Sequence, residues 1–149
     1  MPRWYFEDLT PGFVLEADGP TLTQAEIIDF AKKFDPQYFH TDPEAAKDSN
    51  FGALCASGWH TASVCMRIIC DAYLLDAASL GSPGIDELRW TRPVFVNDTL
   101  KLKMTVIEQR PSRSKPEQGS VLSKWELFNQ NGEPVMHMTG WGMFKKRGA

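Results

Sequence analysis

Asp35 and His40 lie five residues apart, in an irregular segment between two stretches with helical character. A carboxylate and an imidazole can add water to a conjugated thioester, because one takes a proton from water and the other delivers one to carbon. Aromatic neighbours would shift both pKa values toward neutrality. At this spacing alone a structural role is also open, in which Asp35 ends a helix and His40 precedes the cap of the next.

The other two histidines, His60 and His137, are expected to have structural roles. His60 falls near the start of a long apolar helix, where the positive end of the helix dipole disfavours a charged imidazole. His137 lies between two methionines in a strand pattern and is expected to be packed or at an interface. No His and carboxylate spacing matches a metal site, so no metal is expected.

Two short helical segments surround the Asp/His segment. Thr23 and Glu26 form a capping box, which predicts a helix start there, and Pro36 ends this helix shortly after Asp35. Asp42 followed by Pro43 predicts a second helix that runs to about Lys47.

A longer helix is predicted from about Ser57 to Leu75. Its residues are apolar on nearly every side, which is typical of a fully buried helix. Arg67 and Asp71 stand four residues apart and are expected to pair on one exposed strip.

The second half of the chain has the alternating pattern of strands. A turn is expected at Gly81–Gly84, and Asn131-Gly132 predicts a hairpin. Strands are expected at Ile85–Arg92, Leu100–Val106, Ser120–Phe128 and Val135–Phe144. This order predicts an α+β fold, with a curved antiparallel sheet wrapped around a long buried central helix.

Both faces of the last predicted strand carry large apolar side chains, including Met138 and Trp141. We expect its second face or its edge to be buried by another subunit.

The composition limits the class of protein. A length of 149 residues predicts a single domain over residues 1–149, and a net charge of −3 argues against nucleic-acid binding. Cys55, Cys65 and Cys70 show no disulfide or zinc spacing and read as small core residues in a reducing compartment. No segment reaches the roughly 18 to 20 apolar residues of a membrane span, nor is there a signal-peptide core, so a cytoplasmic protein is expected.

The segments Phe34–His40 and Phe51–His60, in this order, resemble the MaoC-like family, which includes R-specific enoyl-CoA hydratases. The segment Leu88–Val94, followed by Asp98, resembles the strand that usually comes after the central helix of that family. The resemblance spans about residues 5 to 144 and implies a hot-dog fold.

The resemblance implies roles for individual residues. Asp35 and His40 would be the hydratase dyad, and the backbone N–H of Gly58 would bind the thioester oxygen. Ser63 is a weaker candidate for orienting water or substrate. The family motif has Asn where this chain has Gln37 and Pro where it has Tyr38. Asn97 stands where the family often has Gly and is expected to adopt left-handed geometry.

The implied function is a hydro-lyase that reversibly hydrates a 2-enoyl-CoA or a related acyl thioester. Coenzyme A would be part of the substrate, no other cofactor is implied, and a homodimer or higher homo-oligomer is expected. Two alternatives remain open from the sequence: an acyl-CoA thioesterase on the same fold, and a non-catalytic acyl-CoA binding domain.

Overall fold

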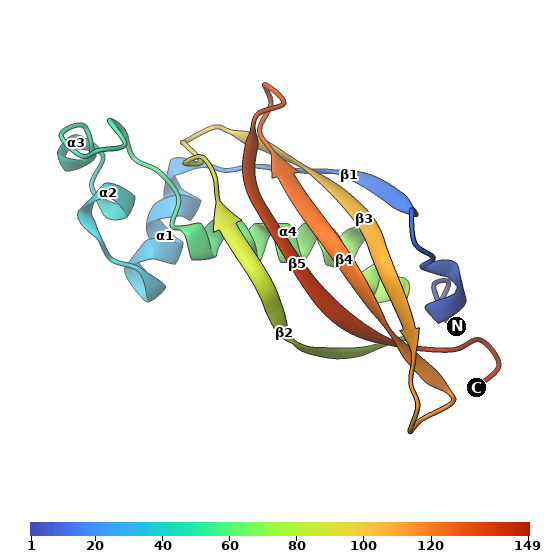
Figure 1. Ribbon diagram of the computed structural model, residues 1–149. Helices are drawn as coiled ribbons and strands as arrows, with labels where there is room; N and C mark the ends of the chain where they lie inside the picture. The colour runs from blue at the N-terminus through green and yellow to red at the C-terminus, as the bar shows by residue number, and fades with distance from the viewer.

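A five-stranded antiparallel sheet curves across one long helix, α4, and the helices α1, α2 and α3 gather at the N-terminal end of α4 (Figure 1). The structure is a computed structural model that describes residues 1–149. The helices are η1 (Phe6–Asp8), α1 (Gln24–Phe34), α2 (Tyr38–Thr41), α3 (Pro43–Ala46), α4 (Gly58–Ala72) and η2 (Leu74–Asp76). The strands are β1 (Val14–Thr21), β2 (Ser79–Trp90), β3 (Thr99–Pro111), β4 (Gln118–Phe128) and β5 (Pro134–Lys145).

The sheet has the order β1-β3-β4-β5-β2, so that β1 and β2 are its edges. A tight turn at Asn131-Gly132 joins β4 to β5, and Gly132 adopts a φ of 74°. The predicted hairpin is therefore confirmed. Asn97 has a φ of 70°, which confirms the left-handed geometry expected at that turn.

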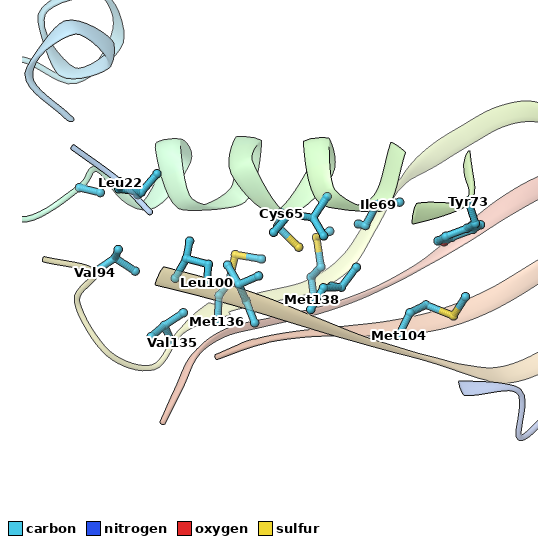
Figure 2. Packing of buried hydrophobic residues seen from close by; sticks show 14 of the residues in the cluster. Leu22, Cys65, Ile69, Tyr73, Val94, Leu100, Met104, Val135, Met136 and Met138 are labelled. Carbon is cyan, nitrogen blue, oxygen red and sulfur yellow. The ribbon is translucent and has the colours of Figure 1, made fainter. Parts of the chain in front are cut away.

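The core lies between α4 and the concave face of the sheet (Figure 2). Alternate residues of β3 from Leu100 to Val106 are buried, as the period of two predicts. They pack in one cluster with Cys65 and Ile69 of α4. This arrangement confirms the α+β class and the hot-dog fold, because the sheet buries one stripe of the helix along its whole length.

The prediction that α4 is buried on all sides is wrong. Trp59 is 59% exposed and Met66 is 42% exposed, while the Arg67–Asp71 pair forms on the same open side at 3.0 Å. A single sheet can cover only one side of a helix, and residue types alone do not say what covers the other. The helix also ends at Ala72, three residues earlier than expected.

The turn expected at Gly81–Gly84 is wrong as well, since these residues belong to β2. Gly81 and Gly84 have φ values of 103° and 151°, and the pairing of β2 with β5 shifts register at both. Glycines of this kind produce irregularities within an edge strand rather than ending it.

The predicted starts of α1 and α3 are confirmed. The Thr23 hydroxyl accepts from the backbone of Glu26, and the Glu26 carboxylate accepts from the backbone of Thr23. The Asp42 carboxylate caps α3. None of the helices is long and apolar enough to cross a membrane.

Candidate active site

Asp35 and His40 meet beside the N-terminal end of α4. Asp35 is the residue that ends α1, and His40 lies on the one-turn helix α2, where the sequence predicts irregular chain. The His40 Nε2 atom is 3.4 Å from Asp35 Oδ2. The His40 side chain is 7% exposed and that of Asp35 is 18% exposed, so only one face of the pair is open. The structure thus brings the two sequence-predicted side chains together.

A backbone carbonyl orients the His40 ring. His40 Nδ1 lies 2.6 Å from the carbonyl oxygen of Cys55, which can only accept a hydrogen bond. Nδ1 therefore carries the proton, and in the neutral ring Nε2 presents a lone pair toward Asp35. A neutral His40 and an ionised Asp35 then form two adjacent acceptors, an arrangement that suits a shared water molecule as donor to both.

Two hydrogen bonds fix the Asp35 carboxylate. Gln37 Nε2 donates to Oδ1 at 2.7 Å, and the hydroxyl of Ser57 donates to Oδ2 at 2.7 Å. Partial burial raises the pKa of Asp35, but the hydrogen bonds from Gln37 and Ser57 outweigh it and lower the pKa overall. Asp35 is therefore ionised at neutral pH.

Ser57 is a residue of the site that the sequence analysis does not single out. It is fully buried and is the N-cap of α4, where its oxygen also accepts from Trp59 N at 3.3 Å. A serine before a long helix is a readable capping signal. Nothing in the sequence, however, says that its hydroxyl proton reaches Asp35, which is 22 residues away along the chain.

Gly58 is the first residue of α4 and lines a cavity of about 310 Å³ together with His40 and Trp90. A Cβ atom at Gly58 would lie 2.4 Å from the Trp90 ring, so only glycine fits against that side chain. The N–H groups of a first helical turn have no partner within the helix. The N–H groups of the next three residues bond to Ser57, so the Gly58 N–H is the free donor of this turn and lies at the positive end of the helix dipole.

Ser63 is not brought to the dyad. It is exposed on α4, and its hydroxyl donates to the Trp59 carbonyl of its own helix at 2.7 Å. His137 is half-buried on β5. The sequence therefore placed Asp35, His40 and Gly58 near one another correctly, whereas Ser63 belongs to the surface of α4.

His60 is buried as a structural residue. Its ring stacks on Phe30 of α1, with centroids 4.7 Å apart, and its Nδ1 atom has no hydrogen-bond partner. Burial lowers the pKa of His60, against a smaller opposing effect of Glu26. The stack joins α1, which ends at Asp35, to the start of α4.

The Cys55 thiol lies next to the dyad but is not a nucleophile. Burial and the charge of Asp35 raise the pKa of Cys55 to about 11, so the thiol keeps its proton. Cys65, whose pKa burial raises to about 12, and Cys70 are likewise free thiols.

The fold is similar to those of known proteins. The MaoC-like dehydratase from Rhodospirillum rubrum is 37% identical, with a TM-score of 0.90 over 97% of this chain and 99% of that one. The mesaconyl-CoA hydratase of Cereibacter sphaeroides is 39% identical over 64 residues, which are 43% of this chain and 18% of that protein. An R-hydratase from Pseudomonas aeruginosa shares the fold at 23% identity, with a TM-score of 0.79 over 96% of this chain and 86% of that one.

The family described as "MaoC like domain" matches residues 9–124, which include the dyad, the start of α4 and most of the sheet. The chain belongs to the MaoC-like family.

Proposed function

We propose that this protein is a hydro-lyase that reversibly adds water across the double bond of a 2-enoyl-CoA or a related acyl thioester. The observation that carries the proposal is the pair of acceptors, Asp35 Oδ2 and His40 Nε2, which lie 3.4 Å apart beside the free N–H of Gly58 at the start of α4. The name of the related mesaconyl-CoA hydratase supports coenzyme A as the carrier of the acyl group. No cofactor beyond the substrate's own coenzyme A is needed for this chemistry.

The addition of water begins with a water molecule that donates one hydrogen bond to Asp35 and one to His40. Its oxygen attacks the β-carbon of the enoyl group as one of these two acceptors takes its proton. Negative charge then develops on the thioester oxygen, where the Gly58 N–H and the dipole of α4 stabilise it. A proton delivered by the dyad to the α-carbon completes the reaction, so that a hydroxyl and a hydrogen are added across the double bond.

Asp35 and His40 titrate as a coupled pair, so the proton delivered to the α-carbon is assigned to the pair and not to one of its members. Hydrogen bonds from Gln37 and Ser57 lower the pKa of Asp35, so the carboxylate is ready to accept from water. The carbonyl of Cys55 keeps the lone pair of His40 on the atom that faces Asp35.

We further infer that the protein is a homodimer or a higher homo-oligomer. The edge strand β2 is exposed along its length and carries three large apolar side chains, which are Leu80, Ile85 and Trp90. An exposed edge with large apolar side chains is a surface that favours association with another chain. A second copy would also close the site from the side of Trp90.

The proposal is tested by incubating the protein with crotonyl-CoA and longer enoyl-CoAs. Loss of the enoyl absorbance without release of free thiol is the expected result. Thiol release would instead identify a thioesterase, and binding with neither reaction would identify a non-catalytic acyl-CoA binding domain.

Variants at the dyad test the assigned residues. Asp35→Asn and His40→Gln are each expected to lower kcat/KM for hydration by roughly 10²- to 10⁴-fold, the usual effect of a lost acid or base. Matched controls are Asp29→Asn, at an exposed carboxylate of α1, and His137→Gln on β5, both of which should retain activity. Full activity in both dyad variants would refute the assignment.

A further inference from the structure

The cavity at the dyad contains one strongly basic side chain that the proposed reaction does not use. His40 and Gly58 line this cavity, and so does Arg92, which is the only lysine or arginine in the lining. No aspartate or glutamate lines the cavity. The addition of water to a plain alkyl enoyl group is assigned to the dyad and the Gly58 N–H. The charge of Arg92 is therefore free for another group of the ligand.

Backbone hydrogen bonds on both sides fix Arg92 beside the start of α4. The N–H of Arg92 donates to the carbonyl of Val135 on β5 at 3.4 Å. Two residues further on, the carbonyl of Val94 accepts from Ala56 N at 2.8 Å. The segments that this bond joins run antiparallel. Arg92 and Gly58, each two residues from the bond, therefore lie at the same end of the pair and line the same cavity.

The guanidinium group of Arg92 has one ionic partner in the chain. Its Nη2 atom is 3.0 Å from Glu133 Oε2, and the Arg92 side chain is 49% exposed. A guanidinium carries five N–H donors in a planar fork, which fits a carboxylate with two parallel hydrogen bonds. The donors that Glu133 leaves free are available to an anionic ligand.

The size of the cavity indicates which part of a thioester substrate carries the anion. Its volume of about 310 Å³ is at the small end of the range for ligand cavities, roughly 300 to 1,000 Å³, so it suits a short acyl group. A pantetheine arm of about a dozen bonds, roughly 15 Å when extended, separates the thioester sulfur from the phosphates of coenzyme A. With the thioester carbonyl at Gly58, an extended arm places the phosphates beyond this cavity, whereas a carboxylate on the acyl group lies inside it.

We propose that Arg92 binds a carboxylate on the acyl group, and that the protein prefers 2-enoyl thioesters with a carboxylate close to the double bond. A second carboxylate near the ionised Asp35 needs a cationic partner, because like charges repel and removal from water is costly. Arg92 is the cation that the cavity offers. This inference rests on the proposed function for the position of the thioester beside Gly58.

Rates of hydration with three short substrates test the inference. They are crotonyl-CoA, glutaconyl-CoA, which carries a carboxylate on the terminal carbon of the crotonyl group, and the primary amide of glutaconyl-CoA, which has the same shape without the charge. We expect kcat/KM to be roughly five- to twentyfold higher for glutaconyl-CoA than for its amide. Equal values for these two, with crotonyl-CoA hydrated, would overturn the inference and leave the proposed function intact.

Variants assign the preference to Arg92. In Arg92→Gln the ratio of kcat/KM for glutaconyl-CoA to that for its amide should fall to about one, whereas Arg92→Lys keeps the charge and should keep a ratio above one. Arg89→Gln is the matched control, because Arg89 is exposed on β2 and does not line the cavity. A ratio in Arg92→Gln as high as in the unaltered protein would contradict the role of this side chain.

Glu133→Gln separates anion binding by Arg92 from the ion pair itself. This variant removes the carboxylate that competes for Arg92, and it keeps an oxygen to accept the hydrogen bond that Asn129 donates at 3.0 Å. The ratio should therefore stay as high as in the unaltered protein or rise. If the ion pair served stability alone, Arg92→Gln and Glu133→Gln would both lower the free energy of unfolding and leave the ratio unchanged, which would overturn the inference.

Binding is measured independently of activity with saturated thioesters, which cannot be hydrated. In calorimetric titrations glutaryl-CoA should bind roughly five- to twentyfold more tightly than butyryl-CoA, and Arg92→Gln should abolish the difference. Pantetheine thioesters of the same two acyl groups lack the phosphates and should show the same difference. A loss of affinity in Arg92→Gln that is equal for the two CoA esters and absent for the pantetheine esters would identify phosphate binding and refute the inference.

Tighter binding of glutaryl-CoA through Arg92, with no hydration of any enoyl-CoA, would support the role of Arg92 and refute the proposed hydratase. Hydration with no preference for the carboxylate would refute the role of Arg92 alone.

Discussion

At the scale of single residues, three hydrogen bonds decide what the dyad can do. Asp35 receives one from Gln37 and one from Ser57, and His40 gives one to the carbonyl of Cys55. The first two stabilise the ionised carboxylate, and the third selects the tautomer of the imidazole. Asp35 Oδ2 and His40 Nε2 therefore face each other in a fixed orientation.

Ser57→Ala is expected to change the pH dependence of hydration. The Ser57 hydroxyl lowers the pKa of Asp35, so its removal raises that pKa and moves the acid limb of kcat/KM to higher pH. The variant also loses the N-cap of α4, at a cost of about 1 kcal/mol in the free energy of unfolding.

The pH profile of kcat/KM and urea unfolding measure these two effects separately. Ser57→Thr keeps a hydroxyl and serves as the matched control. Because the pKa of Asp35 is lowered in the folded state, its stabilising contribution is present above its ordinary pKa and is lost as the pH falls. An acid limb in Ser57→Ala that coincides with that of the unaltered protein would contradict the positioning role of Ser57.

At the scale of elements, the short helix α2 accommodates a residue in which the chain differs from its family's motif. Tyr38, which replaces the motif proline, is the first residue of α2, and its N–H has no partner in the chain. Proline is favoured at this position because its fixed φ suits a helix start, but other residues also occupy it. The replacement therefore leaves the placement of His40 intact.

Tyr38→Pro should accordingly be tolerated. Gln37 already has the extended conformation, with φ −72° and ψ 146°, that a following proline requires. We expect this variant to be more stable than Tyr38→Ala by roughly 0.4 to 1 kcal/mol, since proline restricts the unfolded chain. Comparing the two variants by urea unfolding removes the contribution of the tyrosine ring, and a less stable proline variant would argue against a helix start at Tyr38.

The contact between α1 and α4 should make the protein sensitive to acid. Because burial lowers the pKa of His60, the unfolded state binds a proton there at pH values where the folded state does not. The free energy of unfolding therefore falls as the pH drops below the ordinary histidine pKa of 6.5. Glu26, the acidic group that faces His60, opposes this effect only in part.

His60→Phe should keep the stack on Phe30 and lose less stability between about pH 7.5 and about pH 5.5. His137→Phe, at a half-buried position of β5, is the matched control. Its free energy of unfolding should change between the two pH values by as much as that of the unaltered protein. Denaturant unfolding at the two pH values gives the comparison. An unchanged dependence in His60→Phe would show that other groups cause the acid sensitivity.

At the scale of the whole molecule, the exposed strand β2 predicts association. Leu80→Lys places a charge on this edge, at a residue that does not line the cavity at the dyad, and is expected to shift the protein from dimer toward monomer in sedimentation experiments. Lys101→Arg on the exposed side of β3 is a control that should leave the oligomeric state unchanged. A dimer of undiminished stability in Leu80→Lys would place the interface elsewhere.

The sequence by itself determined most of the elements and singled out Asp35 and His40 as candidates. The capping box at Thr23, the period of two in β3 and the Asn131-Gly132 turn are local signals, and each depends on neighbouring residues only. The spacing of Asp35 and His40 alone left a structural role open, and the order of the motifs around these two residues specified the family.

Only the tertiary structure decided which groups surround the dyad and which faces stay open. Ser57 and the carbonyl of Cys55 reach Asp35 and His40 across 22 and 15 residues of chain, and no local pattern encodes such contacts. The exposed side of α4 and the irregular glycines within β2 follow from how one sheet packs on one helix. The energies that fix them come from long-range packing, which the spacing of residue types does not record.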